Sequence, residues 1–310
     1  MPPKQFQGLF SVTVTPFGAD GGLDLAGFAR ILEWHIAQGS AGLAIAADNG
    51  EASLLSITER QAMAEAAVRV AAGRVPVVMG AMGTHAFTAA DTAKMVEVAA
   101  AAGVDAVLVS PAPYVGHATR AEIVGRYRDI HRAAPLPMIA YNNPRHFGVA
   151  VDGDTLQNLM DEVELVGVKQ SSRDFLDVCT ALERFGDRLS FFMGCGWLIM
   201  PGLAAGAAGV LSTGVDLFGR DSARLVELAR AAWTPETRRV HLRIARAYKA
   251  LLETGTAPSA LKAILNSLGL PAGIPRPPVL PLRGEEFDRL RMLFAELGVL
   301  PAAPASQAGA

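Results

Sequence analysis

The sequence predicts an α/β protein built on a (β/α)8 TIM barrel with a C-terminal helical extension. A short β-branched run, a polar or glycine-rich turn and an alanine-rich amphipathic segment follow one another eight times. The strand-like runs are apolar nearly throughout, which is typical of a parallel sheet covered on both faces. The 310 residues suit one barrel of about 200 to 250 residues followed by further helices.

The eight repeats give the expected elements in order. The strands are predicted at residues 9–15, 42–47, 75–81, 106–110, 137–141, 165–169, 190–194 and 209–212. The helices between them are predicted at residues 24–38, 58–72, 86–102, 119–133, 153–161, 174–185 and 197–205. Asp24 with Gly27, and Thr58 with Gln61, indicate capped helix starts, the second pair resembling a capping box.

After the eighth strand the pattern changes to helices alone. These are expected at residues 219–232, 235–254, 259–268 and 284–298, with a proline-rich connector at 271–281. We therefore expect a catalytic barrel over 1–216, a helical domain over 217–300 and a disordered tail over 301–310. An open doubly wound sheet is the alternative, but Thr15-Pro16-Phe17-Gly18 follows the first strand in place of the glycine fingerprint of that fold.

Composition limits the classes of function. A net charge of −2, without a basic stripe, argues against a nucleic-acid partner. Cys179 and Cys195 suggest no disulfide framework, and the N-terminus lacks a signal-peptide pattern, so we expect a cytoplasmic protein.

Residues 189–215 carry no charge over a length that could span a membrane. Glycines and a proline interrupt them, which favours strand, helix and strand in a barrel and no membrane span.

Lys169 ends the apolar run Leu165-Val166-Gly167-Val168. The other four lysines lie in the N-terminal tail or in helical segments, where a solvated ammonium is expected. A lysine that points from a strand into a core is expected to lose its proton, because burying an unpaired ammonium is costly. The neutral amine would be a nucleophile, with its pKa lowered from about 10.4 to roughly 7 to 8. The alternative is a surface lysine paired with Glu164 or Asp174.

Active sites of such barrels form at the C-terminal ends of the strands. Asp48 and Asn49 follow the second strand, Tyr114 follows the fourth, Tyr141 ends the fifth, and Gly194 ends the seventh. A phenol beside a neutral amine can shuttle protons while a carbinolamine forms and dehydrates. Tyr141 could instead be an aromatic residue of the core.

Three motifs together resemble the family of class I Schiff-base aldolases that includes dihydrodipicolinate synthase and N-acetylneuraminate lyase. They are Gly50-Glu51 followed by Leu55, Thr58 and Arg60, then Tyr141-Asn142-x-Pro144, and finally Gly167-Val168-Lys169-x-Ser171-Ser172. The resemblance implies that Lys169 forms an imine with pyruvate or another 2-oxo acid without a cofactor, and that Tyr141 relays protons. It also implies that Gly194 and Leu211 line the pocket, and that a homotetramer lends Tyr114 to the neighbouring site.

The chain departs from the family pattern at three positions. Asp48 and Asn49 replace two hydroxyl residues that hold the pyruvate carboxylate and complete the proton relay. His146 stands where dihydrodipicolinate synthases carry an arginine, with Arg145 one step early. We therefore expect an aldolase or dehydratase acting on pyruvate or a 2-oxo-3-deoxy acid. The alternatives are 4-hydroxy-tetrahydrodipicolinate synthase activity and a non-catalytic 2-oxo-acid-binding relative. The histidines show no ligand spacing, so no metal is expected.

Overall fold

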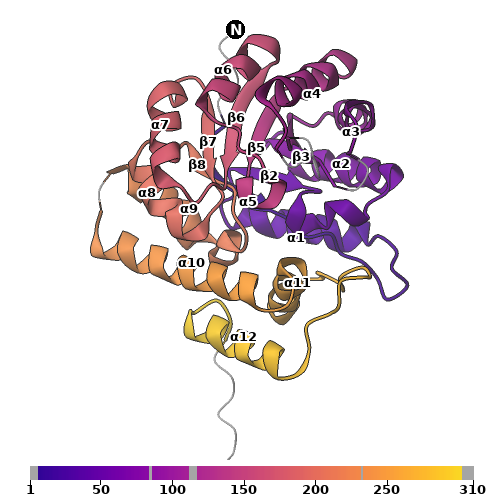
Figure 1. Ribbon diagram of the computed structural model, residues 1–310. Coiled ribbons are helices and arrows are strands. Elements are labelled where there is room, and N and C mark those ends of the chain that lie inside the picture. Colours follow the sequence, from indigo (N-terminus) through magenta and orange to yellow (C-terminus); the bar gives the residue numbers. More distant parts are fainter. Residues whose placement is uncertain (1–5, 84–85, 112–116, 232, 302–310) are drawn as a thin grey trace, which may run out of the picture.

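Eight parallel strands close into a barrel in the order of the sequence, β1 to β8 (Figure 1). The computed structural model describes residues 6–83, 86–111, 117–231 and 233–301. The strands are Gly8–Val12, Gly42–Ile45, Val77–Ala81, Ala106–Val109, Met138–Asn142, Leu165–Gln170, Ser190–Met193 and Gly209–Val210. The predicted TIM barrel is confirmed. Tyr114 and residues 302–310 of the predicted tail lie outside the described residues.

Helices surround the barrel and continue beyond it. Helices α1 to α8 span Leu25–Ala37, Ile57–Ala71, Ala89–Ala102, Arg120–Ala133, Pro144–Phe147, Gly153–Glu162, Phe175–Phe185 and Ile199–Ala204. Helices α9 to α12 span Arg220–Ala231, Pro235–Glu253, Ala257–Ser267 and Gly284–Glu296. Helix α9 contacts β1 of the barrel, whereas α10, α11 and α12 pack on one another at one side of the molecule (Figure 1). The predicted C-terminal helices are confirmed.

The apolar core has two layers. One fills the barrel and includes Phe10, Ala44, Phe192 and Leu211, and the other lies between the strands and the surrounding helices. Close packing inside the barrel requires a glycine at position 42, because a Cβ there would lie 2.3 Å from the Phe10 ring. Since both faces of the strands are buried, their near-continuous apolar runs are explained.

Four short 3-10 helices connect elements in the described residues: η1 (Asp48–Gly50), η2 (Ala52–Leu54), η3 (Gly196–Leu198) and η4 (Val215–Phe218). Neither η1 nor the short helix α5 is among the predicted elements. The charge-free segment 189–215 folds as β7, η3, α8 and β8 and enters η4. Within the described residues, no helix combines the length and apolarity needed to cross a membrane.

The predicted capping box at the start of α2 is wrong by two residues. Ser56 caps the helix by accepting a hydrogen bond from the Glu59 N–H, and the Glu59 carboxylate accepts one from the Ser56 N–H. Gln61 instead donates to Glu65 on the exposed face of the helix. The Glu59 carboxylate is the stronger acceptor, which favours the earlier box. The Asp24 cap is confirmed, because its side chain accepts a 2.8 Å hydrogen bond from Gly27.

Lys262, which we expected to be solvated, is buried on α11. Its ammonium pairs with the Glu51 carboxylate, and both side chains are 1% exposed. Glu51 has a left-handed backbone (φ 54°), and its other oxygen accepts a hydrogen bond from the Arg276 N–H. This buried pair attaches the loop after β2 to the C-terminal helices. The error arises because Glu51 is far from Lys262 in the sequence.

Candidate active site

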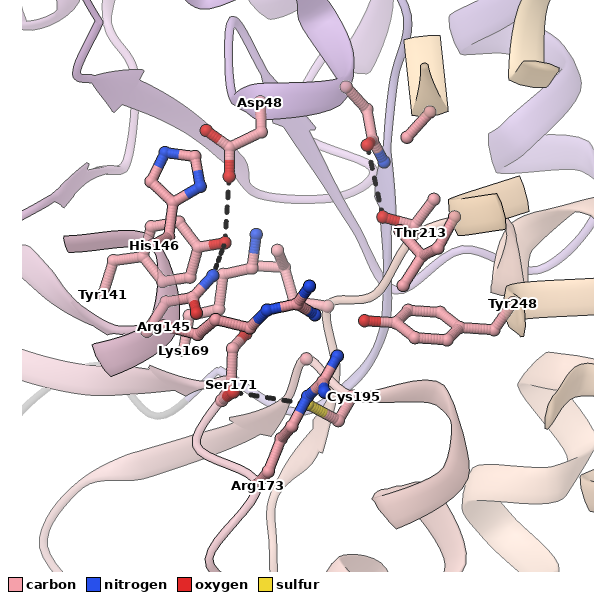
Figure 2. Close-up of a pocket in the computed structure, with 16 residues that line it drawn as sticks. Asp48, Tyr141, Arg145, His146, Lys169, Ser171, Arg173, Cys195, Thr213 and Tyr248 are labelled. Atoms are coloured by element: carbon pink, nitrogen blue, oxygen red, sulfur yellow. Dashed lines mark hydrogen bonds between the residues drawn. The ribbon is translucent and has the colours of Figure 1, made fainter. Parts of the chain in front are cut away.

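A cavity of about 400 Å³ opens at the C-terminal ends of the strands. Its lining residues come from five barrel loops and from two C-terminal helices (Figure 2). They are Asp48, Asn49, Tyr141, Asn143, Arg145, His146, Lys169, Ser171, Arg173, Gly194, Cys195, Leu211, Thr213, Tyr248, Leu252 and Ala257. The volume lies in the range of small-molecule sites.

Lys169 lies on β6 and is only 6% exposed. Strand β5 pairs with β6 so that Tyr141 is directly opposite Lys169, and the Lys169 Nζ lies 4.2 Å from the centre of the Tyr141 ring. Burial lowers the pKa of the Lys169 amine, while the charges of Asp48 and Cys195 oppose that shift. The structure therefore places a lysine with a lowered pKa on the cavity wall, beside a phenol.

The Tyr141 phenol is held by two polar neighbours. Its O–H donates a 2.9 Å hydrogen bond to Asp48 Oδ2, and its oxygen accepts a 3.2 Å hydrogen bond from the Asn143 amide (Figure 2). Burial, then the negative charge of Asp48, raises the pKa of Tyr141 well above its usual value. The phenol is therefore the protonated partner of this pair, and Asp48 is the acceptor.

Asn49 and Gly194 line the same cavity as the lysine. The Asn49 Oδ1 accepts a 3.2 Å hydrogen bond from the Thr213 hydroxyl, which leaves the Asn49 amide N–H groups as donors. Gly194 leaves room that a side chain would fill, since a Cβ there would lie 2.1 Å from the Ser171 Oγ. Leu211 and His146 also line the cavity, and His146 is exposed at its mouth.

Two other residues of the sequence motifs hold the loops and strand ends around the site. The buried guanidinium of Arg60 donates hydrogen bonds to the carbonyls of Gly80 and Met82, at 2.8 and 2.7 Å, and to that of Ala52. Asn142 donates to the Gln170 side chain at 3.0 Å and ties β5 to β6. These residues position the loops and strand ends that carry the cavity residues.

Several cavity residues were not predicted as site residues. Ser171 and Arg173 follow Lys169 closely, and Cys195 follows Gly194, so their nearness to predicted residues was a usable signal. Tyr248, Leu252 and Ala257 come from α10 and α11 and had no such signal. Their position depends on how the C-terminal helices pack over the mouth of the barrel.

The arrangement is suited to carbonyl chemistry. A buried lysine can add to a carbonyl once neutral, and the adjacent phenol can give a proton to the departing hydroxyl. Asp48 can accept a proton from the phenol. Among the described residues, no group of three or more His, Cys, Asp or Glu side chains is placed to hold a metal ion.

The sequence is similar to those of known proteins. The sequence profile of the Dihydrodipicolinate synthetase family matches residues 5–296. The 4-hydroxy-tetrahydrodipicolinate synthase of Synechococcus sp. (strain WH7803) is 34% identical over 281 residues, which are 90% of this chain and 91% of that protein.

Solved structures give the same result. Dihydrodipicolinate synthase from Aquifex aeolicus superposes with a TM-score of 0.88 at 26% identity, covering 96% of this chain and 100% of that one. The chloride-inhibited dihydrodipicolinate synthase from Acinetobacter baumannii, solved in complex with pyruvate, gives a TM-score of 0.86 at 27% identity, with coverage of 96% and 100%. The family resemblance drawn from the three motifs is confirmed.

Proposed function

Because the chain belongs to the dihydrodipicolinate synthetase family, we propose that it activates a 2-oxo acid as an imine on Lys169. It is a class I lyase, and its substrate is pyruvate or a 2-oxo-3-deoxy acid. The observation that carries the proposal is the buried Lys169 amine beside the Tyr141 phenol. Burial lowers the pKa of that amine, which favours the nucleophilic form.

The first stage is imine formation. The neutral Lys169 amine adds to the C2 carbonyl of the substrate, and the resulting carbinolamine loses its hydroxyl as water. Tyr141 relays a proton from solvent to that hydroxyl, since its phenol lies beside the amine. Asn49 holds the substrate carboxylate through its side-chain N–H donors, because its oxygen is already occupied by Thr213.

Asp48 replaces a hydroxyl in the proton relay. In aldol cleavage the C3–C4 bond breaks, its electrons move into the iminium to form an enamine, and the C4 hydroxyl loses its proton. The Tyr141 oxygen accepts that proton while the phenolic proton moves to Asp48 Oδ2, 2.9 Å away. No free phenolate forms, which suits a phenol whose pKa is raised by burial and by Asp48.

The Asp48 carboxylate is turned toward Tyr141, so it need not face the substrate carboxylate. This orientation lessens the repulsion that a carboxylate in a hydroxyl position would otherwise cause. A carboxylate in the relay provides the proton acceptor that cleavage or dehydration of an adduct requires, and the same acceptor can take a proton from the methyl group of pyruvate.

A second candidate function is 4-hydroxy-tetrahydrodipicolinate synthase. It is favoured by the names of the relatives, one of which is 34% identical over 90% of this chain. The synthase reaction uses the same imine. It differs from the lyase reaction because it forms a carbon–carbon bond to an aldehyde, whereas the lyase breaks one. Pyruvate consumption in the presence of the aldehyde partner of that synthase distinguishes it from release of pyruvate by a lyase.

Borohydride reduction with pyruvate, followed by peptide mass spectrometry, tests the proposal. We expect a stable adduct on Lys169 and no adduct in Lys169→Met. Lys94, an exposed lysine on α3, provides the matched control, because Lys94→Met should still form the adduct. No adduct with pyruvate or any other 2-oxo acid would refute the proposal. A coupled lactate dehydrogenase assay then separates an aldolase, which releases pyruvate, from a dehydratase.

The remaining alternative is a binding protein that keeps the lysine pocket without turnover. It predicts that a 2-oxo acid raises the melting temperature while no candidate substrate is consumed. It also predicts that Asn49→Thr changes activity more than Tyr141→Phe does. The enzyme predicts the opposite order, because Tyr141 lies against the amine.

For the assembly we propose a cytoplasmic homotetramer, in which Tyr114 of one subunit reaches a neighbouring site. Family membership supports the tetramer. The two free cysteines, Cys179 and Cys195, support a cytoplasmic location. Analytical ultracentrifugation should give a tetramer mass, and Tyr114→Phe should slow turnover without preventing the Lys169 adduct. A monomer at micromolar concentration would contradict this assembly.

A further inference from the structure

We propose that Tyr248 is a specificity-determining residue of this site, whose phenol donates a hydrogen bond to a hydroxyl oxygen on the part of the substrate beyond C3. Tyr248 lies on α10, outside the barrel, and yet lines the cavity. The inference rests on the proposed imine at Lys169 and deepens it, because it assigns part of the recognition of the substrate to the C-terminal helices.

Tyr248 is held in one position by its neighbours. Its ring packs on Gly196, where a Cβ would lie 2.4 Å from the ring carbon Cγ. The ring centre lies 5.2 Å from that of Trp197, in an edge contact, and the residue is only 9% exposed. A donor fixed in this way loses little freedom when a ligand binds, so less of its hydrogen bond is offset by the cost of ordering.

The Tyr248 hydroxyl has a weak partner within the protein. Among the described residues, it shares a side-chain hydrogen bond with Cys195. The Cys195 S–H donates to the Ser171 carbonyl at 3.3 Å, which leaves the sulfur as the acceptor for the phenol. Sulfur is a weak acceptor. A substrate oxygen is a stronger one, so the exchange of partners favours a substrate that places an oxygen beside Tyr248.

The phenol of Tyr248 is a donor and not a second proton relay. Burial, then the nearby Cys195, raises the pKa of Tyr248, whereas Arg173 lowers it, and the hydroxyl keeps its proton at neutral pH. The acidic side chain that lines the cavity is Asp48, and its carboxylate accepts the hydrogen bond of Tyr141. The Tyr248 proton therefore has no adjacent base to move to, and the group is suited to binding.

Tyr248 lies where a longer substrate would extend. Figure 2 shows it across the cavity from Tyr141 and Asp48, with its hydroxyl directed inward. A cavity of about 400 Å³ has room for more than a three-carbon acid. A substrate that reaches this wall without an oxygen leaves the buried phenol with its weak partner, which discriminates against that substrate.

A matched pair of six-carbon acids tests the proposal. 2-Oxohexanoate and 4,5,6-trihydroxy-2-oxohexanoate have the same carbon chain and differ in their hydroxyl groups. For each acid we would measure the concentration that gives half-maximal borohydride labelling of Lys169, counting the six-carbon adduct and any three-carbon adduct of a cleaved acid together. The ratio of the two concentrations defines the preference. We expect Tyr248→Phe to lower the preference for the trihydroxy acid about tenfold, the effect of one hydrogen bond.

The variant isolates the hydroxyl group. Tyr248→Phe keeps the ring that packs on Gly196 and Trp197, and a general change in reactivity cancels because both acids are compared on the same protein. Leu242→Ala, on the exposed side of α10, is the matched control and should keep the preference of the unaltered protein. Tyr248→Leu also lacks the hydroxyl and should lower the preference too, which provides the test if the first variant does not fold.

The outcomes separate this inference from the proposed function. An unchanged preference in a folded Tyr248→Phe protein would overturn the role of Tyr248 and leave the imine intact. Labelling of Lys169 by pyruvate but by neither six-carbon acid would do the same, because the site would then admit no longer substrate. Absence of labelling by all three acids would overturn the imine itself, and with it this inference.

Discussion

The Tyr141 phenol donates a 2.9 Å hydrogen bond to the Asp48 carboxylate, although the two residues are 93 positions apart in the sequence. Tyr141 is the penultimate residue of β5, and Asp48 begins η1 just beyond β2. Because the acceptor of this hydrogen bond is a carboxylate, the partner of the phenol is a base. The proposed relay can therefore end at Asp48.

Asp48→Asn should separate imine formation from proton transfer. The amide oxygen can still accept the Tyr141 hydrogen bond, but it cannot take the proton. We expect the pyruvate adduct on Lys169 to persist, while exchange of the pyruvate methyl hydrogens in D₂O, followed by NMR, slows by about 100-fold or more.

Asp288→Asn, an exposed substitution on α12, is the control for that experiment and should exchange at the normal rate. If Asp48→Asn also exchanges normally, Asp48 is not part of the relay. If it instead loses the adduct, the carboxylate is needed before the imine forms.

Imine formation should depend on pH in a direction set by Lys169. Burial lowers the pKa of its amine below 10.5. The neutral amine is therefore populated at lower pH than in an exposed lysine, and the trapping rate should rise with pH and become level above that lowered pKa. Cyanoborohydride trapping of pyruvate between pH 6 and 10.5 measures the midpoint.

The pH profile of pyruvate trapping in the Asp48→Asn variant checks the effect of the Asp48 charge on Lys169. The Asp48 charge raises the pKa of Lys169 against the effect of burial, so its removal should move the midpoint to lower pH. A midpoint near 10.5 in the unaltered protein, or a shift to higher pH in the variant, would contradict the electrostatics of the site.

The barrel and the lysine–tyrosine pair were predictable because both depend on local pattern. Short apolar runs followed by polar turns define parallel strands, and the ends of neighbouring parallel strands lie side by side. Lys169 and Tyr141 are the penultimate residues of such neighbours and are paired in the register of β5 and β6. No long-range contact had to be known.

The rest of the cavity depends on contacts between distant segments. Tyr248 enters from α10, whose sequence shows only an amphipathic helix, and Arg173 is oriented by Trp197. Lys262 has the pattern of a helical surface lysine, yet it is buried because α11 packs on the loop of Glu51. Helix periodicity shows which face is apolar, but not which loop that face covers.

The buried pair of Glu51 and Lys262 should stabilise the fold. Glu51→Gln would leave the Lys262 ammonium buried with a weaker partner, and breaking a buried ion pair costs about 3 to 5 kcal/mol. We expect that loss in the free energy of unfolding, measured with urea at pH 7. Glu253→Gln breaks the exposed pair with Lys249 and should cost less than about 1 kcal/mol. Equal losses in the two variants would show that burial does not strengthen this pair.

Gly194→Ala should impair the site without unfolding the barrel. The new Cβ would lie 2.1 Å from the Ser171 Oγ and 3.2 Å from the Gln170 carbonyl, so Ser171 and the end of β6 must shift. Since a displacement near 1 Å can cost about 100-fold in rate, we expect trapping of pyruvate on Lys169 to slow by that order.

Gly125→Ala is the matched control, because Gly125 lies within α4 and the nearest atom to its Cβ is an arginine nitrogen 3.6 Å away. That control should gain about 0.5 to 1 kcal/mol of stability from its helix and trap pyruvate normally. Normal trapping by a folded Gly194→Ala protein would mean that this wall of the cavity does not position the reacting lysine.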